Sequence, residues 1–288
     1  MSSLSHTQPR NAGTDKIHID LSGPPQTMLD TLYAKALDAD AARPVLGDVY
    51  ARRLVSQLDY DWDRSAIARQ RRRQVASATV RSAQFDVWAT EFLALHGRAV
   101  VLHLGCGLDS RVFRLNPGPG VDWYDLDYAD VIALRKRLYP TRDHYHLVPA
   151  SATDPSWLAG IPTDRPVLML AEGLSMYLTA DDGLALLRRV VEHFPAGELQ
   201  LDFWSRLGSR VQQKTNKIVT LSGSRLGWTV QGPDDVLAGV PGARLLAADS
   251  LFRAGTVRRL PMSYRFVARS ASRIPALRRS IQLHRYAF

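Results

Sequence analysis

The sequence predicts an α/β protein built on a doubly wound, mostly parallel, Rossmann-like sheet of seven strands. Short apolar runs alternate with helical segments from residue 98 to the end of the chain, which is the order of βαβ units. The first run, 99–104, ends in a Gly-Cys-Gly turn, as the first crossover of such a sheet does. A length of 288 residues with 45% hydrophobic content suits one large core.

The first third of the chain is predicted to be helical. Residues 1–23 are polar and contain turn formers, so we expect them to be flexible. Apolar residues then recur at helical spacing over 26–37 and 47–58. A third helical stretch runs from about 64 to 96, with a break expected near Arg73.

The alternation that follows supplies the sheet. Each predicted strand is a short apolar or β-branched run bounded by turn formers. Thr179, with Asp182 three residues later, marks the clearest helix start. The predicted strands are 99–104, 121–126, 144–150, 166–171, 198–204, 244–248 and 281–288, and the helices between them include 130–138, 154–158, 179–194, 206–217, 233–237 and 262–269.

These patterns divide the chain into three parts. Residues 1–23 form a flexible N-terminus, 24–97 a helical lid, and 98–288 the ligand-binding core. Ligands of doubly wound sheets bind outside the carboxyl ends of the strands, so a lid at that edge would cover them.

The turn Gly105-Cys106-Gly107 is not the dinucleotide fingerprint. The third glycine of that pattern is replaced by Ser110, which Asp109 precedes. Two glycines followed about twenty residues later by acids at a strand end suit a nucleoside ligand without a pyrophosphate, of which S-adenosylmethionine is the commonest. An ordinary tight turn is the alternative.

Acidic residues follow four successive predicted strands. Asp109 follows the first strand, Asp125 and Asp127 end the second, Asp154 follows the third and Glu172 the fourth. A carboxylate after the second strand can accept hydrogen bonds from both ribose hydroxyls, and one after the third strand can accept a hydrogen bond from the adenine amino group. Glu172 can accept a hydrogen bond from an ammonium group. A helix N-cap or a solvated loop is the alternative for any one acid, and for Asp154 in particular.

Composition argues against several other classes of protein. Cys106 is the only cysteine, so we expect no disulfide framework and no cysteine-rich metal site. No apolar run reaches membrane-span length, and residues 1–16 lack the apolar core of a signal peptide, so a cytoplasmic protein without membrane contact is expected.

The net charge of +9 and the run Arg69–Arg73 raise nucleic acid as a partner. Only five of the 37 basic residues are lysine, a skew that fits a GC-rich genome, so we expect a solvated helix face and a small-molecule substrate instead.

Several motifs resemble the leucine carboxyl methyltransferase family, in particular its bacterial branch of polyketide O-methyltransferases of the tetracenomycin-pathway type. The similarity runs from about Met28 to Phe203 and more loosely to Phe288. The matching pieces are Met28–Ala34, Asp59–Asp61, Arg81–Asp86, Gly105–Arg111, Trp123–Asp127 and Ala171–Leu178.

The resemblance implies an S-adenosylmethionine-dependent O-methyltransferase of secondary metabolism. In the family an arginine ahead of the first strand pairs with the cofactor's carboxylate, and Arg81 occupies the matching position. The other cofactor-binding residues it implies are Gly105, Gly107, Asp125, Asp127, Asp154 and Glu172. The strand-end pattern adds Asp109 to these cofactor-binding candidates.

The acceptor is expected to be a small acidic or aromatic molecule, methylated at a carboxylate. A carboxylate with a pKa near about 4 is ionised at pH 7, whereas a phenol with a pKa of about 10 needs a base. No residue is marked as that base, and no catalytic residue is assigned. The histidines that could serve are His103, His144, His146 and His193, and the candidate substrate contacts are Tyr33, Tyr177, Trp204 and Arg206.

Three alternatives stay open. A phenolic O-methyltransferase would share the fold. An amine or nucleic-acid methyltransferase commonly carries an Asn/Asp-Pro-Pro-aromatic turn after the fourth strand, where this chain has Glu172-Gly173-Leu174-Ser175. A non-catalytic protein would bind the cofactor without transferring its methyl group. The oligomeric state is left open.

Overall fold

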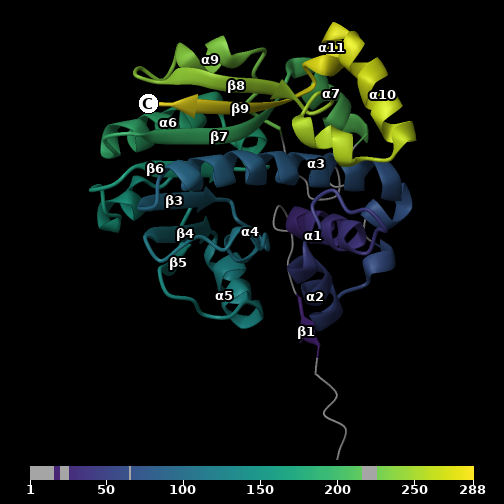
Figure 1. The fold of residues 1–288 in the computed structure, drawn as a ribbon, viewed down its shortest axis with the longest axis horizontal. Helices are drawn as coiled ribbons and strands as arrows, with labels where there is room; N and C mark the ends of the chain where they lie inside the picture. The colour runs from purple at the N-terminus through teal and green to yellow at the C-terminus, as the bar shows by residue number, and fades with distance from the viewer. Residues whose placement is uncertain (1–15, 20–25, 65, 216–225) are drawn as a thin grey trace, which may run out of the picture.

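Seven strands form one mixed sheet in a computed structural model that describes residues 16–19, 26–64, 66–215 and 226–288 (Figure 1). Their order is β5-β4-β3-β6-β7-β9-β8. The first five are parallel, and β9 runs antiparallel to both β7 and β8. The predicted fold class is therefore confirmed. The bounds are β3 Ala99–Leu104, β4 Val121–Asp127, β5 Tyr145–Pro149, β6 Val167–Ala171, β7 Gly197–Trp204, β8 Arg244–Ser250 and β9 Ile281–Ala287.

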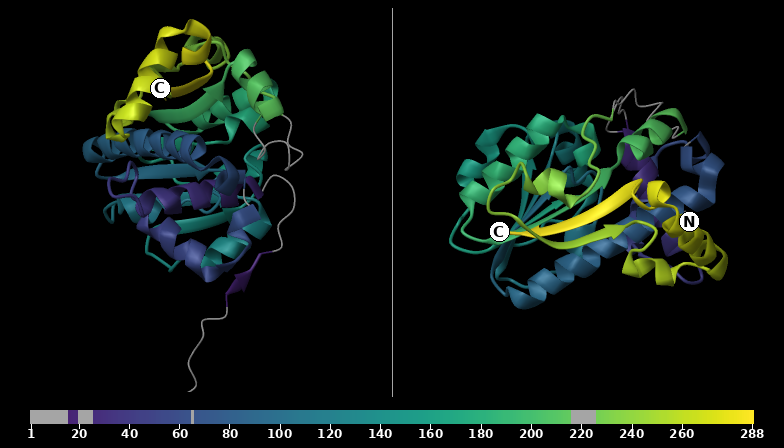
Figure 2. Two further views of the ribbon diagram at one scale, coloured as in Figure 1. Left: turned by 90° about the vertical axis from the view of Figure 1, so that its right-hand side faces the viewer. Right: turned by 90° about the horizontal axis from the view of Figure 1, so that it is seen from above.

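Helices cover both faces of the sheet because its central strands are buried on both sides. All six residues of β3 are buried, and successive side chains point to opposite faces. Val100 and Leu102 pack toward α6 (Ala180–His193), whereas Val101 packs toward α3 (Ala66–Leu95). Figures 1 and 2 show α3 crossing one face of the sheet. Continuous apolar strands are the expected consequence of this layering.

The long helix α3 corrects one prediction. It runs without interruption from Ala66 to Leu95, so the break expected near Arg73 is wrong. No proline or glycine occurs between these residues, and arginine is a good helix former. The side chains of Arg69–Arg73 lie outside the described residues, so their solvated face stays a prediction.

The segment before β3 packs over the carboxyl edge of the sheet. Asp48 caps α2 by accepting the backbone N–H groups of Tyr50 and Ala51. Together α1 and α2 bury an apolar cluster that includes Leu108 and Leu134 of the sheet domain. The elements are β1 Ile17–His18, which pairs with β2 Leu58–Asp59, then α1 Gln26–Ala39, α2 Val49–Gln57 and η1 Trp62–Arg64. The rest of the predicted flexible N-terminus, 1–15 and 20–23, lies outside the described residues.

The remaining helices stand close to their predicted places. Thr179 caps α6 by accepting the backbone N–H of Asp182, as predicted. The helix predicted after Asp154 is a 3-10 helix, and the one predicted over 262–269 extends to Arg273. No helix in the described part of the chain is long and apolar enough to span a membrane. The bounds are α4 Arg111–Leu115, α5 Ala129–Leu138, η2 Pro155–Gly160, η3 Ser175–Tyr177, α7 Arg206–Thr215, α9 Pro233–Leu237, η4 Gly255–Arg259, α10 Met262–Arg273 and α11 Pro275–Arg278.

Candidate functional site

A cavity of about 930 Å³ lies at the carboxyl edge of the sheet, between α1, α3 and α10. Its two ends differ in chemistry. The polar end is lined by Lys35, Arg81, His103, Gly105, Gly107, Asp109 and Glu172, and the apolar end by Met176, Trp204, Leu251, Phe252, Val257, Leu260, Ala268, Ala271 and Ile281. A large pocket with a few convergent polar groups is the usual form of a small-molecule site.

The predicted glycine turn forms part of the polar end. Gly105 has φ +62° and Gly107 has φ +49°, a left-handed conformation that side-chain-bearing residues rarely adopt. A Cβ on Gly107 would lie 3.2 Å from the Cβ of Met28 in α1, and one on Gly105 would lie 3.2 Å from Leu174 Cδ1. The turn is therefore closely covered by the N-terminal helix and by the loop after β6.

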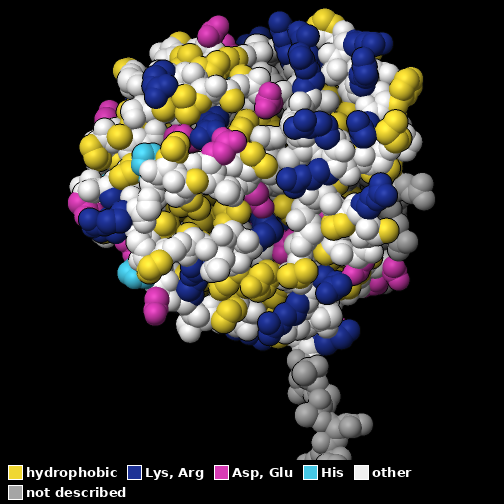
Figure 3. Space-filling view, in the orientation of Figure 1, with side chains coloured by type: hydrophobic (Ala, Val, Ile, Leu, Met, Phe, Trp, Pro, Cys, Tyr) yellow, Lys and Arg dark blue, Asp and Glu magenta, His cyan; other side chains and the backbone are white. Residues whose placement is uncertain are grey.

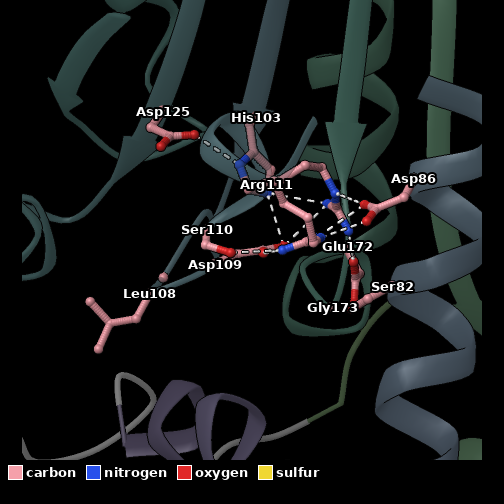
Figure 4. A network of polar contacts seen from close by, with 12 residues as sticks. Ser82, Asp86, His103, Leu108, Asp109, Ser110, Arg111, Asp125, Glu172 and Gly173 are labelled. Atoms are coloured by element: carbon pink, nitrogen blue, oxygen red, sulfur yellow. Dashed lines mark hydrogen bonds and ion pairs between the residues drawn. The ribbon is translucent and has the colours of Figure 1, made fainter. Parts of the chain in front are cut away.

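An ion-pair network joins the turn to α3 and β6 (Figure 4). Arg111 is fully buried, donates to Asp86 at 2.8 Å, and also donates to Glu172. Ser82 donates a 2.6 Å hydrogen bond to the same Glu172 carboxylate. Burial alone would raise the pKa of Glu172, but the cations Arg111, Lys35 and Arg81 hold that pKa well below its ordinary value. Glu172 is thus a fixed negative charge on the cavity wall.

Arg81 reaches the cavity from α3. Its guanidinium donates to Glu172 at 3.1 Å and to Asp202 at 2.8 Å, and its side chain is 17% exposed. Burial lowers the pKa of Arg81, but the two carboxylates outweigh it and raise that pKa. The arginine is therefore charged, held in place, and open to the cavity.

Sequence reasoning missed a second cation, Lys35 of α1. Its ammonium lies 3.1 Å from Asp109 Oδ2, its side chain is only 3% exposed, and it lines the cavity. Burial raises the pKa of Asp109, but Arg111 and Lys35 bring that pKa well below normal. The signal was present, because Lys35 continues the stripe Met28, Leu32 at i, i+4, i+7, where a charge interrupts an apolar face.

The two acids of β4 have different positions. Asp125 is fully buried below the turn, where it pairs with Arg135, accepts from Tyr145 at 2.6 Å and lies 2.8 Å from His103 Nδ1. Asp127 accepts the backbone N–H of Gly107 at 2.7 Å and is partly exposed. Asp127 therefore lies beside the turn, although it is not among the residues that line the cavity, whereas Asp125 is already enclosed by its partners.

The other predicted residues are only partly brought together. Tyr177 and Trp204 line the cavity, and the Trp204 Nε1 has no hydrogen-bond partner among the described residues. Asp154 is exposed and caps η2, so the N-cap alternative describes its visible role. Tyr33 stacks on a tryptophan of η1, and Arg206 is exposed on α7, and neither lines the cavity.

The candidate bases are narrowed in the same way. Among the described histidines, only His103 lines the cavity. His144 and His146 are about half exposed beside Asp122, and His193 contacts a backbone carbonyl. No cluster of described residues has the composition of a metal site.

Comparison with known proteins identifies the family. The model of the leucine carboxyl methyltransferase family matches residues 28–191, more than half of the chain. The chain belongs to the leucine carboxyl methyltransferase family. It is an S-adenosylmethionine-dependent methyltransferase.

Two relatives of this methyltransferase cover most of its length. It is 40% identical to the tetracenomycin polyketide synthesis O-methyltransferase TcmP of Streptomyces glaucescens over 94% of this chain and 98% of that protein. It is 35% identical to the S-adenosyl-L-methionine-dependent methyltransferase dpfgK of Gibberella zeae over 80% of this chain and 83% of the other. The fold also matches the structure of a Thermobifida fusca protein provisionally assigned as a methyltransferase, with a TM-score of 0.60 at 14% identity over 88% and 93% of the two chains.

The polar end of the methyltransferase's cavity fits the cofactor's chemical groups. Its methionine part carries an ammonium and a carboxylate, and here the cations Lys35 and Arg81 stand beside the anions Asp109 and Glu172. Gly107 of the turn lines the same end, where Met28 covers the position that a Cβ would take. Charges of both signs beside a glycine turn suit a zwitterionic nucleoside.

Proposed function

We propose that this methyltransferase acts on a small acidic or aromatic, polyketide-like acceptor of secondary metabolism and methylates it at a carboxylate. The observation that carries the proposal is the absence of an available base among the described residues that line the cavity. Both nitrogens of His103 are engaged, Nδ1 with Asp125 at 2.8 Å and Nε2 facing Arg111 Nη1 at 3.4 Å. A carboxylate is ionised at pH 7 and does not need a base.

The carboxylates of the cavity support the same proposal. Asp109 and Glu172 each contact a buried arginine or lysine, and both pKa values lie well below normal. A weakly basic carboxylate is a poor proton acceptor for a phenol. These groups are better suited to holding a ligand's ammonium than to removing a proton.

We assign the cofactor-contacting roles to residues at the polar end and to Asp127, which lies beside that end and accepts the backbone N–H of Gly107. Arg81 and Lys35 would hold the carboxylate of the methionine part, and Glu172 its ammonium. Asp127 would accept from the ribose, beside the backbone of Gly107. S-adenosylmethionine would supply a methyl group on a positively charged sulfur. The acceptor oxygen would attack the methyl carbon in line as the bond from that carbon to the sulfur breaks, and S-adenosylhomocysteine would leave. The protein's part is to hold the two molecules in line at about 3 to 3.5 Å and to exclude water.

The acceptor would lie at the apolar end. Tyr177 and Trp204 both line the cavity, Tyr177 from the segment after β6 and Trp204 from the end of β7. The unpartnered indole N–H of Trp204 supports a hydrogen bond to an acceptor oxygen. The helical segment 24–97 would then act as a lid, since α1 lines the polar end over the turn.

Three finer expectations belong to the same proposal. We propose a cytoplasmic enzyme with a small-molecule substrate and no nucleic-acid partner. The similarity of the whole chain to TcmP supports a diffusible small-molecule acceptor. No described feature adds a nucleic-acid motif to the basic composition.

A product assay tests the proposal. The protein is incubated with methyl-labelled S-adenosylmethionine and a panel of aromatic polyketide acids, matched phenols and a peptide ending in leucine. We expect label in an aromatic acid, released by mild alkali as methanol, because a methyl ester is cleaved where an aryl methyl ether is not. Alkali-resistant label in the phenols would contradict carboxylate methylation.

A further inference from the structure

The apolar end of the cavity is built mainly by the last forty residues of the chain. Helix α10 contributes Ala268 and Ala271, η4 contributes Val257, and the start of β9 contributes Ile281. Trp204 completes this wall from the end of β7. No ionised side chain belongs to this part of the described lining. The apolar end is therefore suited to a hydrocarbon or aromatic body.

The face of α10 that lines the cavity combines two alanines with the larger residues Tyr264 and Val267. Ala268 is only 7% exposed and lines the cavity, as does Ala271. The helix otherwise packs chiefly against α11 and η4, its neighbours in the chain. Protein interiors are close-packed, and an apolar void costs stability in proportion to its volume. A leucine or phenylalanine at position 268 or 271 would fill part of this space, so the two alanines leave room for an acceptor.

The outer face of α10 has the opposite character. Met262 and Phe266 are each 73% exposed, and Arg265, Arg269 and Arg273 are exposed beside them. Figure 3 shows Lys and Arg side chains gathered over α10 and α11. No acidic residue occurs from Ser250 to the end of the chain, so the wall of the acceptor end carries a positive field that favours an anionic molecule.

We propose that Ala268 and Ala271 determine the size of the methyl acceptor, by leaving room for a planar apolar body of more than one ring. The inference rests on the proposed function, which it deepens by naming the residues that select the acceptor. Neither alanine belongs to the ion-pair network at the polar end. Filling the space they leave therefore removes acceptor binding without removing cofactor binding.

Binding of a graded series of aromatic acids tests this assignment. The probes are benzoate, 2-naphthoate and anthracene-2-carboxylate, titrated by calorimetry into the full chain loaded with S-adenosylhomocysteine. The variants are Ala268→Phe and, should that protein fail to fold, the smaller change Ala271→Leu. The matched control is Ser270→Phe, which places the same bulk on the exposed side of α10, away from the cavity.

We expect the wild type to bind anthracene-2-carboxylate more tightly than benzoate. Ala268→Phe or Ala271→Leu should weaken the three-ring acid at least tenfold and benzoate less than threefold. Affinity for S-adenosylhomocysteine should change less than twofold, and Ser270→Phe should change none of these. Equal losses for all three acids, or no loss in a folded variant, would overturn the assignment. A wild type that binds S-adenosylhomocysteine but none of the acids would overturn the assignment of Ala268 and Ala271 alone. A wild type that does not bind S-adenosylhomocysteine would refute the proposed function itself.

Discussion

The two ends of the cavity are held together by different forces. At the polar end, buried charges are fixed by one another, as where Arg111 joins Asp86, Asp109 and Glu172. At the apolar end, apolar residues from segments distant in sequence enclose the space, as do Trp204 of β7 and Ala268 of α10. The ion pairs fix the positions and directions of a few charged groups. The apolar packing fixes the volume of the space that an acceptor can occupy.

This difference matches what each end has to do. A cofactor that is the same in every turnover benefits from preorganised charges, which cost nothing to rearrange on binding. An acceptor that differs between related enzymes is better selected by the size of an apolar space, where one added methylene changes affinity by about 1–3 kcal/mol. We therefore expect that removing one charge disrupts the ion-pair network of the polar end. At the apolar end, we expect that changing the size of one side chain changes which acceptors fit.

The largest effect is expected from removing Arg111. This guanidinium is fully buried, and Arg111→Ala leaves Asp86, Asp109 and Glu172 without their shared cation. Breaking a buried ion pair from one side costs about 3–5 kcal/mol. Urea unfolding at pH 7 should show a loss of that order in the free energy of unfolding.

The control for this comparison is Arg98→Ala. Arg98 is 72% exposed and only pairs with Asp164 at 3.5 Å, so its removal should cost less than about 1 kcal/mol. If Arg111→Ala proved as stable as Arg98→Ala, the polar end would not be held by its charges.

Cofactor affinity should respond next. Lys35→Met and Arg81→Met each remove one cation that lines the polar end. Loss of one charge-assisted contact to a carboxylate costs about 1.5–3 kcal/mol, so S-adenosylhomocysteine should bind roughly 10- to 100-fold more weakly. Calorimetry of the folded variants measures this, with Arg98→Met as the control for net charge. An equal loss in all three would mean that general charge, and not position, governs binding.

The polar end was largely predictable from the sequence, and the apolar end was not. Gly107, Asp109 and Glu172 follow buried strands, and because parallel strands end at one edge, their sequence positions bring them together. Lys35 was missed because its partner Asp109 lies in the loop after β3, more than seventy residues away, although its place on an apolar stripe was visible. The sequence does not predict which of Asp125 and Asp127 is buried. They lie two residues apart at one strand end, yet Asp125 is buried and Asp127 is partly exposed.

The apolar end depends on facts that no local pattern contains. Strand β9 inserts between β7 and β8, and this pairing across about eighty residues brings Ile281 to the end of β7 beside Trp204. The helix over 262–269 was predicted, but which of its faces borders the cavity follows only from that insertion. Contacts between segments that are far apart in sequence determine the volume of the apolar end, and the hydrophobic periodicity of one segment cannot predict that volume.

Acid should lower the free energy of unfolding through Asp125, the buried carboxylate below the turn. Burial raises the pKa of Asp125, but Arg135 and His103 outweigh it and lower that pKa to about 2. A carboxyl with a depressed folded pKa stabilises the protein above its unfolded pKa of about 3.9, and this stabilisation is lost as pH falls toward the folded value. The contribution is on the order of 2 kcal/mol, and roughly half of it should be gone at pH 3.

Comparison with Asp125→Asn isolates this group. Burial raises the pKa of Asp202 and of Asp127, so these two act with the opposite sign and the wild-type curve alone mixes the contributions. The difference in unfolding free energy between wild type and variant, measured in urea, should shrink between pH 5 and pH 3. A difference that stays constant over that range would show that the pKa of Asp125 is the same in the folded and unfolded protein.

The smallest effect should come from His103, which stands where catalysis would need a base. If the acceptor is a carboxylate, it is ionised throughout pH 6 to 9 and the chemical step should vary less than about threefold over that range. His103→Gln should preserve the flat profile, although the loss of a partner for Asp125 can lower the rate uniformly. Single-turnover rates are needed, because product release can otherwise limit turnover and hide the chemistry. A limb rising through roughly pH 6 to 7 that disappears in His103→Gln would instead identify the imidazole as a base, and a phenol as the acceptor. His144→Gln serves as the matched control, since that imidazole is 49% exposed beside Asp122 and does not line the cavity.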